Sequence, residues 1–407
     1  MGRFITALGI GQFCAWGTLY YSFPQIAEAM GAELGWSKAE RYLAPTLTLI
    51  VAAVSAMPVG IAIDRGHGRL VMSLGALAAG LLLLAWSRVE TLAGFYAVFA
   101  ALGIVHAATL YDAAFAVVAR HTGPERARRG ITLLTLWGGF ASTVFIPLVE
   151  LMLSRWDWRM CVATLAVVPI ALCAPLNAYA IRSLRDSAPV ASTGREKAIA
   201  RAPLRWALAK PTYWALAVVF IAHAGVFSGF TYHAYPLLQE FGLGAGSVVG
   251  VLALIGPAQV AGRLALHLAP AGPSIATLGV GASGLTFLVF ITLALAPTSV
   301  ALAGVLAIVY GAANGVMTIV RGMAVPALLT RHAYGRVTAS LIAPATVTKA
   351  AAPAAAAMLW GLTQGYGPVL LALALGSAVL TLAFWAAAVG SRTRHSARGD
   401  TAGTAEV

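Results

Sequence analysis

The sequence predicts an all-α polytopic membrane protein with twelve spanning helices arranged as two six-helix halves. Three observations support this fold class. Only 10% of the residues are charged and 60% are hydrophobic, with a mean hydropathy of +0.83, whereas soluble domains carry about 25% charged residues. The hydrophobic residues gather in runs of about 20, the length that crosses a bilayer. One long polar stretch divides the chain near its middle.

Twelve apolar runs are long enough to span the hydrocarbon core. Because lipid offers no partner for backbone N–H and C=O groups, we expect each run to form a helix. The predicted spans cover residues 4–27, 41–63, 69–87, 92–119, 130–153, 159–181, 211–238, 247–268, 274–295, 299–328, 337–360 and 367–389.

The basic residues give the expected direction of the spans. With a cytoplasmic N-terminus, 19 of the 27 Lys and Arg residues fall in cytoplasmic loops and tails, and five fall in external loops. The other three, Arg263, Arg321 and Lys349, lie inside predicted spans. This bias predicts that both termini are cytoplasmic. Loop cations also explain the net charge of +13, so we expect no nucleic-acid partner.

The longest polar segment predicts the domain organisation. Residues 183–210 are rich in Ser, Pro and charge, which is typical of a linker. We expect residues 1–182 to form the N-terminal six-helix half and residues 211–390 the C-terminal half. Residues 391–407 are predicted to be a cytoplasmic tail.

The two halves share a short pattern where their first spans end. The sequence YYSFP at 20–24 is followed by Glu28, and YHAYP at 232–236 is followed by Glu240. A second pair of similar segments follows spans four and ten, where ARHTGPERARRG corresponds to TRHAYGRVTA. Matching segments at corresponding places favour an internal duplication.

A dense polar cluster lies between spans two and three. Gly60 is followed four residues later by Asp64 and Arg65, and then by Arg69. This cluster resembles the signature of the major facilitator superfamily, and the resemblance extends over the twelve spans, the linker and the duplication. It implies the major facilitator fold and a transport function. It also implies that these four residues form a latch that holds one conformation, whereas the alternative is a solvated, positively charged loop.

Two positions depart from the usual form of that signature. His67 stands where the superfamily usually has Gly, and Leu70 stands where it usually has a second basic residue. These departures put the strength of the latch in question.

A further segment lies just after the first span. AELGWSKAE at 32–40 resembles bacterial relatives of monocarboxylate transporters and of the oxalate:formate antiporter. This resemblance implies small carboxylates as the substrate class. We therefore expect a multi-pass monomer in the bacterial inner (cytoplasmic) membrane, with the lipid bilayer and a small anionic substrate as its partners.

Arg321 in predicted span ten is the main candidate for binding an anion, because an ionisable residue within a span is costly and marks a functional site. Gly311, Asn314, Thr318 and Arg321 share one helix face. The resembling fold places spans one, four, seven and ten around a central cavity. A guanidinium group can bind a carboxylate with two parallel hydrogen bonds. The alternative is a structural ion pair between Arg321 and Asp112.

Three more ionisable residues lie within predicted spans. Asp112 is expected at nearly the depth of Arg321, so that a substrate anion could open a salt bridge between them. His106 could carry a proton near neutral pH, or it could be a hydrogen-bonded packing residue. Lys349, near the middle of span eleven, could form a second anion site or a countercharge.

Two polar residues near the inner end of span eight, Arg263 and Gln259, are predicted to be gating or structural residues.

A polar and aromatic stripe follows the first span. Gln12, Trp16 and Tyr20 repeat every four residues, and His223 occupies a similar place on span seven. Either the stripe contributes to binding, or it serves helix packing and the interfacial aromatic belt.

The motifs present and missing limit the function classes. Three cations and one acid within the spans favour an anionic cargo over a cationic drug. No HExxH, GxSxG or metal-ligand spacing occurs, and Cys14, Cys161 and Cys173 are expected to be buried apolar residues, so we expect no enzyme, metal or cofactor. The sequence predicts a secondary active transporter that moves a small organic anion by alternating access, driven by protons or anion exchange. Drug or metabolite efflux by proton antiport is the first alternative, and a non-transporting membrane sensor is the second.

Overall fold

The structure is a computed structural model in which the described residues are 2–181, 201–268, 273–296, 299–330 and 334–402. The segments at 183–200 and 403–407 lie outside these ranges, so the expected linker is described only from Arg201 onward. The described chain is folded into helices joined by short turns.

The N-terminal half contains both long helices and short π-helical turns, here labelled η. Its elements are α1 (Gly2–Trp16), η1 (Gly17–Tyr21), α2 (Phe23–Leu34), α3 (Lys38–Ala62), η2 (Ile63–His67), α4 (Gly68–Trp86), α5 (Leu92–Thr109), α6 (Tyr111–Gly139), α7 (Ala141–Leu153), α8 (Trp158–Val168), η3 (Pro169–Cys173) and α9 (Ala174–Ala180).

The C-terminal half is likewise built from α-helices and a short π-helical turn. Its elements are α11 (Arg201–Leu208), α12 (Pro211–Glu240), α13 (Ala245–Ala253), α14 (Ile255–Leu268), α15 (Ile275–Leu295), α16 (Val300–Ala324), η4 (Val325–Leu329), α17 (Tyr334–Thr363) and α18 (Gly367–Ala402).

Ten helical segments within the described residues are long and apolar enough to cross a membrane. One of them, Lys38–Trp86, is 49 residues long and contains both the second and the third predicted span. The region that holds the first predicted span is not among the ten. It is divided at Ser22 and carries the buried polar residues Gln12 and Gln25. The number of twelve spans, and the side on which the termini lie, therefore stay predictions.

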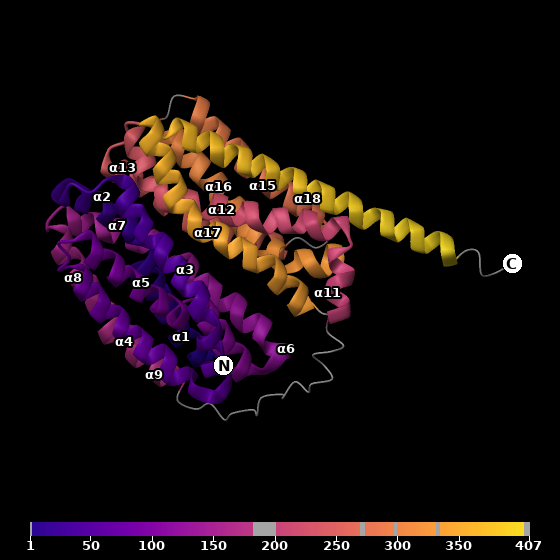
Figure 1. The fold of residues 1–407 in the computed structure, drawn as a ribbon, viewed down its shortest axis with the longest axis horizontal. Coiled ribbons are helices and arrows are strands. Elements are labelled where there is room, and N and C mark those ends of the chain that lie inside the picture. Colours follow the sequence, from indigo (N-terminus) through magenta and orange to yellow (C-terminus); the bar gives the residue numbers. More distant parts are fainter. Residues whose placement is uncertain (1, 182–200, 269–272, 297–298, 331–333, 403–407) are drawn as a thin grey trace.

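The two halves form two helical bundles that lie next to each other (Figure 1). The bundles approach each other around α2, α7 and α13, and they diverge towards α6 and α11. We call the end where the bundles approach each other the distal side. We call the end where they diverge, which carries the N-terminus, the terminal side. Helices α3 and α17 pack together across the two halves.

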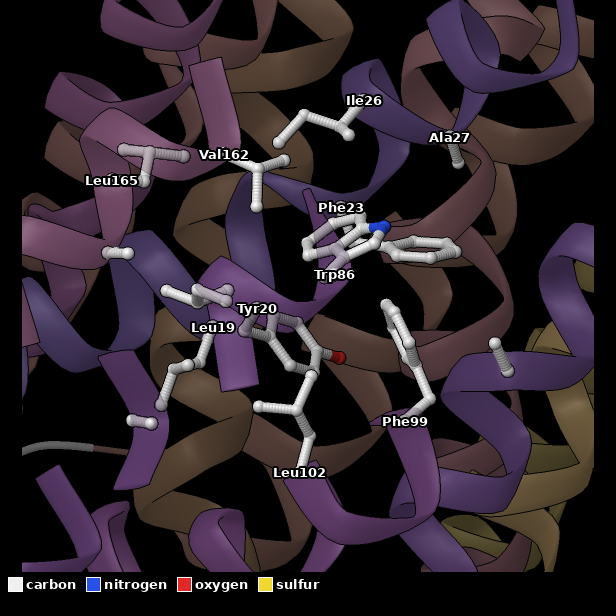
Figure 2. Close-up of a cluster of buried hydrophobic side chains, with 14 of the residues drawn as sticks. Leu19, Tyr20, Phe23, Ile26, Ala27, Trp86, Phe99, Leu102, Val162 and Leu165 are labelled. Carbon is white, nitrogen blue, oxygen red and sulfur yellow. The ribbon is translucent and has the colours of Figure 1, made fainter. Parts of the chain in front are cut away.

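The core of the N-terminal half is an aromatic cluster. Phe23 and Trp86 stack with ring centroids 6.1 Å apart, and Phe99 contacts both rings at 5.4 and 4.9 Å. Figure 2 shows Tyr20 among these buried side chains. Phe23 also meets Tyr232 of the other half, at 5.8 Å between centroids. This packing fixes the position of Tyr20 at the interface of the halves.

Several helices are interrupted near the interface between the halves. Residues Gly17–Tyr21 form a π-helical turn, Leu110 separates α5 from α6 with an extended conformation, and Leu254 separates α13 from α14. Irregular backbone within a membrane is tolerated only where protein or water covers it. These interruptions are consistent with a cavity at this depth.

The signature cluster forms an exposed turn between α3 and α4. Gly66 has a φ of +91°, a conformation that glycine adopts much more readily than other residues. The side chains of Asp64, Arg65 and Arg69 are exposed. The Arg120 guanidinium of α6 donates a hydrogen bond to the backbone carbonyl of Asp64. This contact joins the turn to another helix of the same half.

The three cysteines Cys14, Cys161 and Cys173 are buried and free, as the sequence predicts.

Candidate binding site between the two halves

A cavity of about 50 Å³ lies between the two halves. The N-terminal half contributes residues of η1, α2 and α7 to its wall, and the C-terminal half contributes residues of α12, α13, α14 and α16. Among the residues predicted from the sequence, Tyr20 and Gln259 line this cavity. It is therefore formed jointly by elements from both halves.

Two equivalent residues of the repeated pattern form part of the wall. Tyr20 begins the YYSFP segment and Tyr232 begins the YHAYP segment, and their ring centroids lie 4.9 Å apart. Tyr21 and Tyr235 of the same segments also line the cavity. Of these four tyrosines, the sequence predicted only Tyr20 as a candidate for binding.

Three buried polar atoms of lining residues lack a hydrogen-bond partner within the described part of the chain. They are the hydroxyl oxygens of Tyr20 and Tyr310 and the side-chain oxygen of Gln25. A buried polar group without a partner costs about 1–3 kcal/mol, so such groups usually meet water or a ligand. The described lining residues carry no formal charge. The cavity suits an uncharged, aromatic or hydroxyl-bearing part of a ligand.

Glu150 accepts hydrogen bonds from two residues of the cavity wall. Its Oε2 atom accepts a hydrogen bond from Gln25 Nε2 at 2.9 Å and another from the Tyr235 hydroxyl at 2.8 Å. Gln25 belongs to the N-terminal half and Tyr235 to the C-terminal half, so this carboxylate joins the halves. We missed Glu150 in the sequence because it lies close to the end of predicted span 130–153. Its position inside that apolar run was the available signal.

Lys38 and Tyr42 make further contacts across the distal side. The Lys38 ammonium lies 4.0 Å from the ring centroid of Trp360 and 3.3 Å from the hydroxyl of Tyr366. The Tyr42 ring stacks on the His233 ring at 4.1 Å. Aromatic and cation–π contacts of this kind stabilise a closed distal interface.

The Gly-Trp-Ser-Lys segment forms the turn that presents Lys38. Gly35 ends α2 with a φ of +68°, and the Trp36 ring packs on Phe95 at 5.3 Å. Ser37 then caps α3 through a reciprocal pair of hydrogen bonds with Glu40. The segment thus has a structural role at the interface between the halves, beyond its value as a sequence pattern.

Arg263 forms a bridge on the terminal side of the cavity. Its Nη2 atom donates to Gln259 Oε1 at 3.3 Å, and its Nη1 atom donates to the Thr135 carbonyl of the other half at 3.3 Å. Gln259 lines the cavity. The predicted gating pair is therefore brought together, although its role in gating stays a prediction.

Arg321 and Lys349 form a cationic region on the terminal side of the cavity. Arg321 lies about 16 Å along α16 from the lining residue Tyr310. Its Nε atom is buried without a hydrogen-bond partner, and its guanidinium lies 5.3 Å from the ring centroid of Phe220. Lys349 is close enough to both Arg321 and Asp112 to interact electrostatically with each. In the part of the chain that the structure describes, neither cation has an ion-pair partner within 4.0 Å.

The proposed salt bridge between Arg321 and Asp112 is absent among the described residues. Asp112 begins α6 directly after the break at Leu110, and Lys349 is the cation with which it interacts electrostatically. Depth along two helices predicts proximity poorly when one helix is interrupted, because the break changes the direction of its side chains.

The two predicted histidines flank this cationic region from opposite halves. His106 is buried beside the main chain of Leu19 and interacts electrostatically with Lys349. His223 is buried near Arg321, and its ring lies 6.2 Å from that of Phe227.

The other predicted site residues lie outside the cavity wall. Gln12 Nε2 donates to the Thr109 carbonyl at 2.6 Å, a helix-packing contact. The Trp16 ring packs on Tyr111 at 4.8 Å. Asn314 is buried within α16. The four signature residues Gly60, Asp64, Arg65 and Arg69 lie at the turn between α3 and α4, away from the cavity.

Solved structures with the same architecture are membrane transporters. One is a bacterial homologue of the human lysosomal transporter Spinster in an inward-facing, occupied conformation, with 14% identity, 96% coverage of each chain and a TM-score of 0.70. Another is the nucleoside transporter NupG, with 17% identity, coverage of 95% of this chain and 99% of that chain, and a TM-score of 0.72. The human organic anion transporter MFSD10 covers 95% of this chain and 99% of its own at 16% identity, with a TM-score of 0.61.

At these identities the likeness concerns the fold alone, and a search of curated protein sequences gave no match. The family model described as Major Facilitator Superfamily, however, matches residues 8–343, which is most of the chain. A helical fold with membrane-spanning segments and a cavity between two halves agrees with that match. The chain belongs to the major facilitator superfamily and has the fold of its transporters.

Proposed function

We propose that the protein is a secondary active transporter of a small organic anion, most simply a carboxylate, that works by alternating access. The observation that carries this proposal is the cationic region formed by Arg321 and Lys349. Both side chains lie within helices that are long and apolar enough to span a membrane, and within the described residues neither forms an ion pair.

Two cations so placed favour the binding of an anion. Charges repel strongly where the effective dielectric constant is low, and removing them from water is costly unless they are compensated. A carboxylate between the two side chains offsets both effects. Arg321 can hold it with two parallel hydrogen bonds, and Lys349 contributes a single compact charge.

Asp112 and His106 supply the part of this site that belongs to the N-terminal half. Asp112 interacts with Lys349 in the absence of substrate, so a bound carboxylate competes with Asp112 for that cation. The competition ties substrate binding to contacts between the halves. Exchange of one anion for another, or movement of a proton, then drives the cycle.

The carboxylate class rests on these cations and on the Gly-Trp-Ser-Lys resemblance. The same resemblance supports a bacterial inner membrane location and assignment to the monocarboxylate and oxalate:formate branch. We further propose that the protein acts as a monomer with cytoplasmic termini.

A second candidate function is efflux of a drug or metabolite by proton antiport. The cavity wall favours it, because the aromatic rings of Tyr20, Phe227, Tyr232 and Tyr310 suit an aromatic compound. The two candidates differ in their need for the cationic region. An anion is attracted by Arg321 and Lys349, whereas a cationic drug gains nothing from them.

Thermal unfolding of the purified protein in the presence of ligands distinguishes the candidates. We would test small mono- and dicarboxylates, aromatic acids and cationic drugs. A ligand that binds only the folded protein stabilises it by about 2.7 kcal/mol at a concentration of about 100 Kd. At least one carboxylate is expected to raise the unfolding temperature of the wild-type protein and leave that of Arg321→Gln unchanged.

The matched control is Arg88→Gln, because Arg88 is exposed in the loop between α4 and α5. This variant should respond to the same carboxylate as the wild-type protein. Uptake of that carboxylate into proteoliposomes should fall by about tenfold or more in Arg321→Gln, as expected for the loss of a charged hydrogen-bond partner. Stabilisation by cationic drugs alone, or unchanged uptake by Arg321→Gln, would contradict the proposal.

A further inference from the structure

We propose that the short helix α11 and the start of α12 form a binding site for an anionic phospholipid on the terminal side. Arg205 and Lys210 bind the phosphate of the headgroup, and the apolar surface of Trp206, Leu208 and Trp214 packs against the glycerol and the upper acyl chains. This surface lies outside the cavity, so the inference does not rest on the proposed transport function.

Helix α11 lies at the terminal end of the C-terminal bundle, next to the start of α12 (Figure 1). Ala207 anchors it there, because this side chain is fully buried in the apolar core that α12 and α17 share. The neighbouring side chains of Arg205, Trp206, Leu208 and Ala209 are exposed. The segment is therefore held to the protein at one residue and presents the residues around it outward.

Helical geometry sets the order of these side chains around the axis. Successive residues of an α-helix are about 100° apart. Arg205 consequently points nearly opposite to the buried Ala207, with Trp206 on one side of it and Leu208 on the other. A basic side chain between apolar ones is typical of a helix that lies in the interface between bilayer and water.

The start of α12 adds a second tryptophan to this surface. Trp214 is 57% exposed, and its indole N–H donates a hydrogen bond to the Leu208 carbonyl at 2.9 Å. This bond joins the end of α11 to the first turn of α12. The Lys210 ammonium, between the two helices, lies 5.6 Å from the ring centroid of Trp206. Two indole rings and two cations are thus gathered in one short segment.

The charge of the segment suits an anion. Residues 195–210 include five basic residues and one acidic residue, and residues 201–214 include no acidic residue. The segment itself therefore supplies no carboxylate that competes for Arg205 or Lys210. Basic residues next to a spanning helix attract anionic lipids, with a gain of about fivefold in affinity for each residue near the surface.

The rings and the cations together favour a phospholipid over a free anion. Tryptophan is enriched where a membrane meets water, because its ring is apolar and its N–H group is polar. A free phosphate would use the two cations and gain nothing from Trp206, Leu208 and Trp214. An anionic phospholipid uses both parts of the surface, since its phosphate and its acyl chains are covalently joined.

A spin label at Ala209→Cys tests the proposal in lipid nanodiscs without any substrate. Ala209 is exposed, and the three native cysteines are buried, which directs the label to the new cysteine. Power-saturation measurements report the access of the label to oxygen, which concentrates in the bilayer, and to a water-soluble nickel chelate. The nanodiscs would contain phosphatidylcholine with an increasing proportion of phosphatidylglycerol.

Phosphatidylglycerol is expected to raise the access of the label to oxygen and to lower its access to nickel. Arg205→Gln and Lys210→Gln should each raise the proportion of phosphatidylglycerol that gives half of this change by about fivefold. The paired exchange Arg205→Lys and Lys210→Arg keeps both charges and should keep the response. Arg88→Gln, which removes an exposed cation of the distal side, should keep it as well.

Two further measurements identify what binds. Inorganic phosphate added to phosphatidylcholine nanodiscs should leave both accesses unchanged, because a free anion does not draw the label towards the bilayer. Unfolding temperatures of the variants in phosphatidylcholine should match the wild-type value, since exposed substitutions of this kind have little effect on stability. Any lost response then reports on lipid binding and not on folding.

Four results would overturn the proposal. The first is a wild-type label whose accesses ignore phosphatidylglycerol, and the second is a full response in the double variant Arg205→Gln and Lys210→Gln. The third is a response reproduced by inorganic phosphate alone. The fourth is a fall in access to oxygen and nickel together, which would show that protein covers this surface. None of these results bears on anion binding at Arg321, and failure of that binding would leave the lipid response unaffected.

Discussion

The rings of Tyr20 and Tyr232 meet across the interface of the two halves, with their centroids 4.9 Å apart. The two residues occupy corresponding places in the repeated segments YYSFP and YHAYP. Both residues line the cavity between the halves. The two rings contact each other directly, so a substitution at either position alters the packing of both halves.

The Tyr20 hydroxyl is expected to matter for ligands and not for folding. It is buried without a hydrogen-bond partner among the described residues. Tyr20→Phe should therefore leave the free energy of unfolding unchanged or raise it by about 1 kcal/mol. Tyr366→Phe is the matched control, because its hydroxyl bonds to His233 at 2.8 Å, and it should lower stability by about 1–3 kcal/mol. Thermal unfolding of both variants measures the difference, and equal destabilisation would contradict the assignment.

Arg321 is expected to destabilise the protein in the absence of an anion. Removing an unpaired charge from water costs several kcal/mol, and an apolar side chain of similar size avoids that cost. Arg321→Met should thus raise the unfolding temperature of the ligand-free protein and abolish its response to carboxylates. Arg41→Met provides the contrast, since Arg41 pairs with Glu28 at 3.3 Å, and its loss should cost about 3–5 kcal/mol. A fall in stability for Arg321→Met would indicate a structural partner for that residue.

Close packing of α14 against α16 is expected to depend on Gly315. A Cβ atom at Gly315 would overlap the backbone carbonyl of Gln259, and overpacking typically costs about 1–3 kcal/mol. Gly322 lies on the same helix, and a Cβ atom there meets nothing within 4 Å. Gly315→Ala should lower the unfolding temperature and disturb Gln259 in the cavity wall, whereas Gly322→Ala should not. Similar unfolding temperatures for the two variants would argue against this close contact.

Substitutions of Gly66 in the signature turn and of Gly60 in the adjoining helix α3 are expected to change stability in opposite directions. Gly66 has a φ of +91°, and a left-handed conformation costs other residues about 1–2 kcal/mol. Gly60 lies inside α3 with nothing within 4 Å of a Cβ atom, and Ala is favoured over Gly in a helix by about 0.5–1 kcal/mol. Gly66→Ala should therefore lower, and Gly60→Ala raise, the unfolding temperature. Two shifts of the same sign would show that the turn is not held in this conformation.

Much of the fold follows from the sequence, because hydrophobic length and loop charge obey simple physical requirements of the bilayer. Most predicted spans coincide with helices that can cross a membrane. The duplication was also visible, since the segments at 20–24 and 232–236 retain the same order of aromatic residues and proline. The cavity was harder to predict, because a lipid-facing surface and a cavity-facing surface are both largely apolar.

Local irregularities explain why the predicted site residues do not all lie together in the structure. Gln12, Trp16 and Tyr20 share one face only if the helix keeps 3.6 residues per turn. The π-helical turn Gly17–Tyr21 changes this spacing, so that Tyr20 and Tyr21 both reach the cavity while Gln12 bonds to Thr109. Hydrophobic periodicity carries no information on such a turn. Glu150 was overlooked for another reason, since an acid near the end of an apolar run resembles an ordinary loop residue.

The interrupted helices give the protein a way to move that rigid halves lack. The turn at Gly17–Tyr21 and the breaks at Leu110 and Leu254 divide three of the predicted spans. These three interruptions are therefore the points at which the helices can bend, because hinges are residues at the ends of elements that absorb the change in φ and ψ.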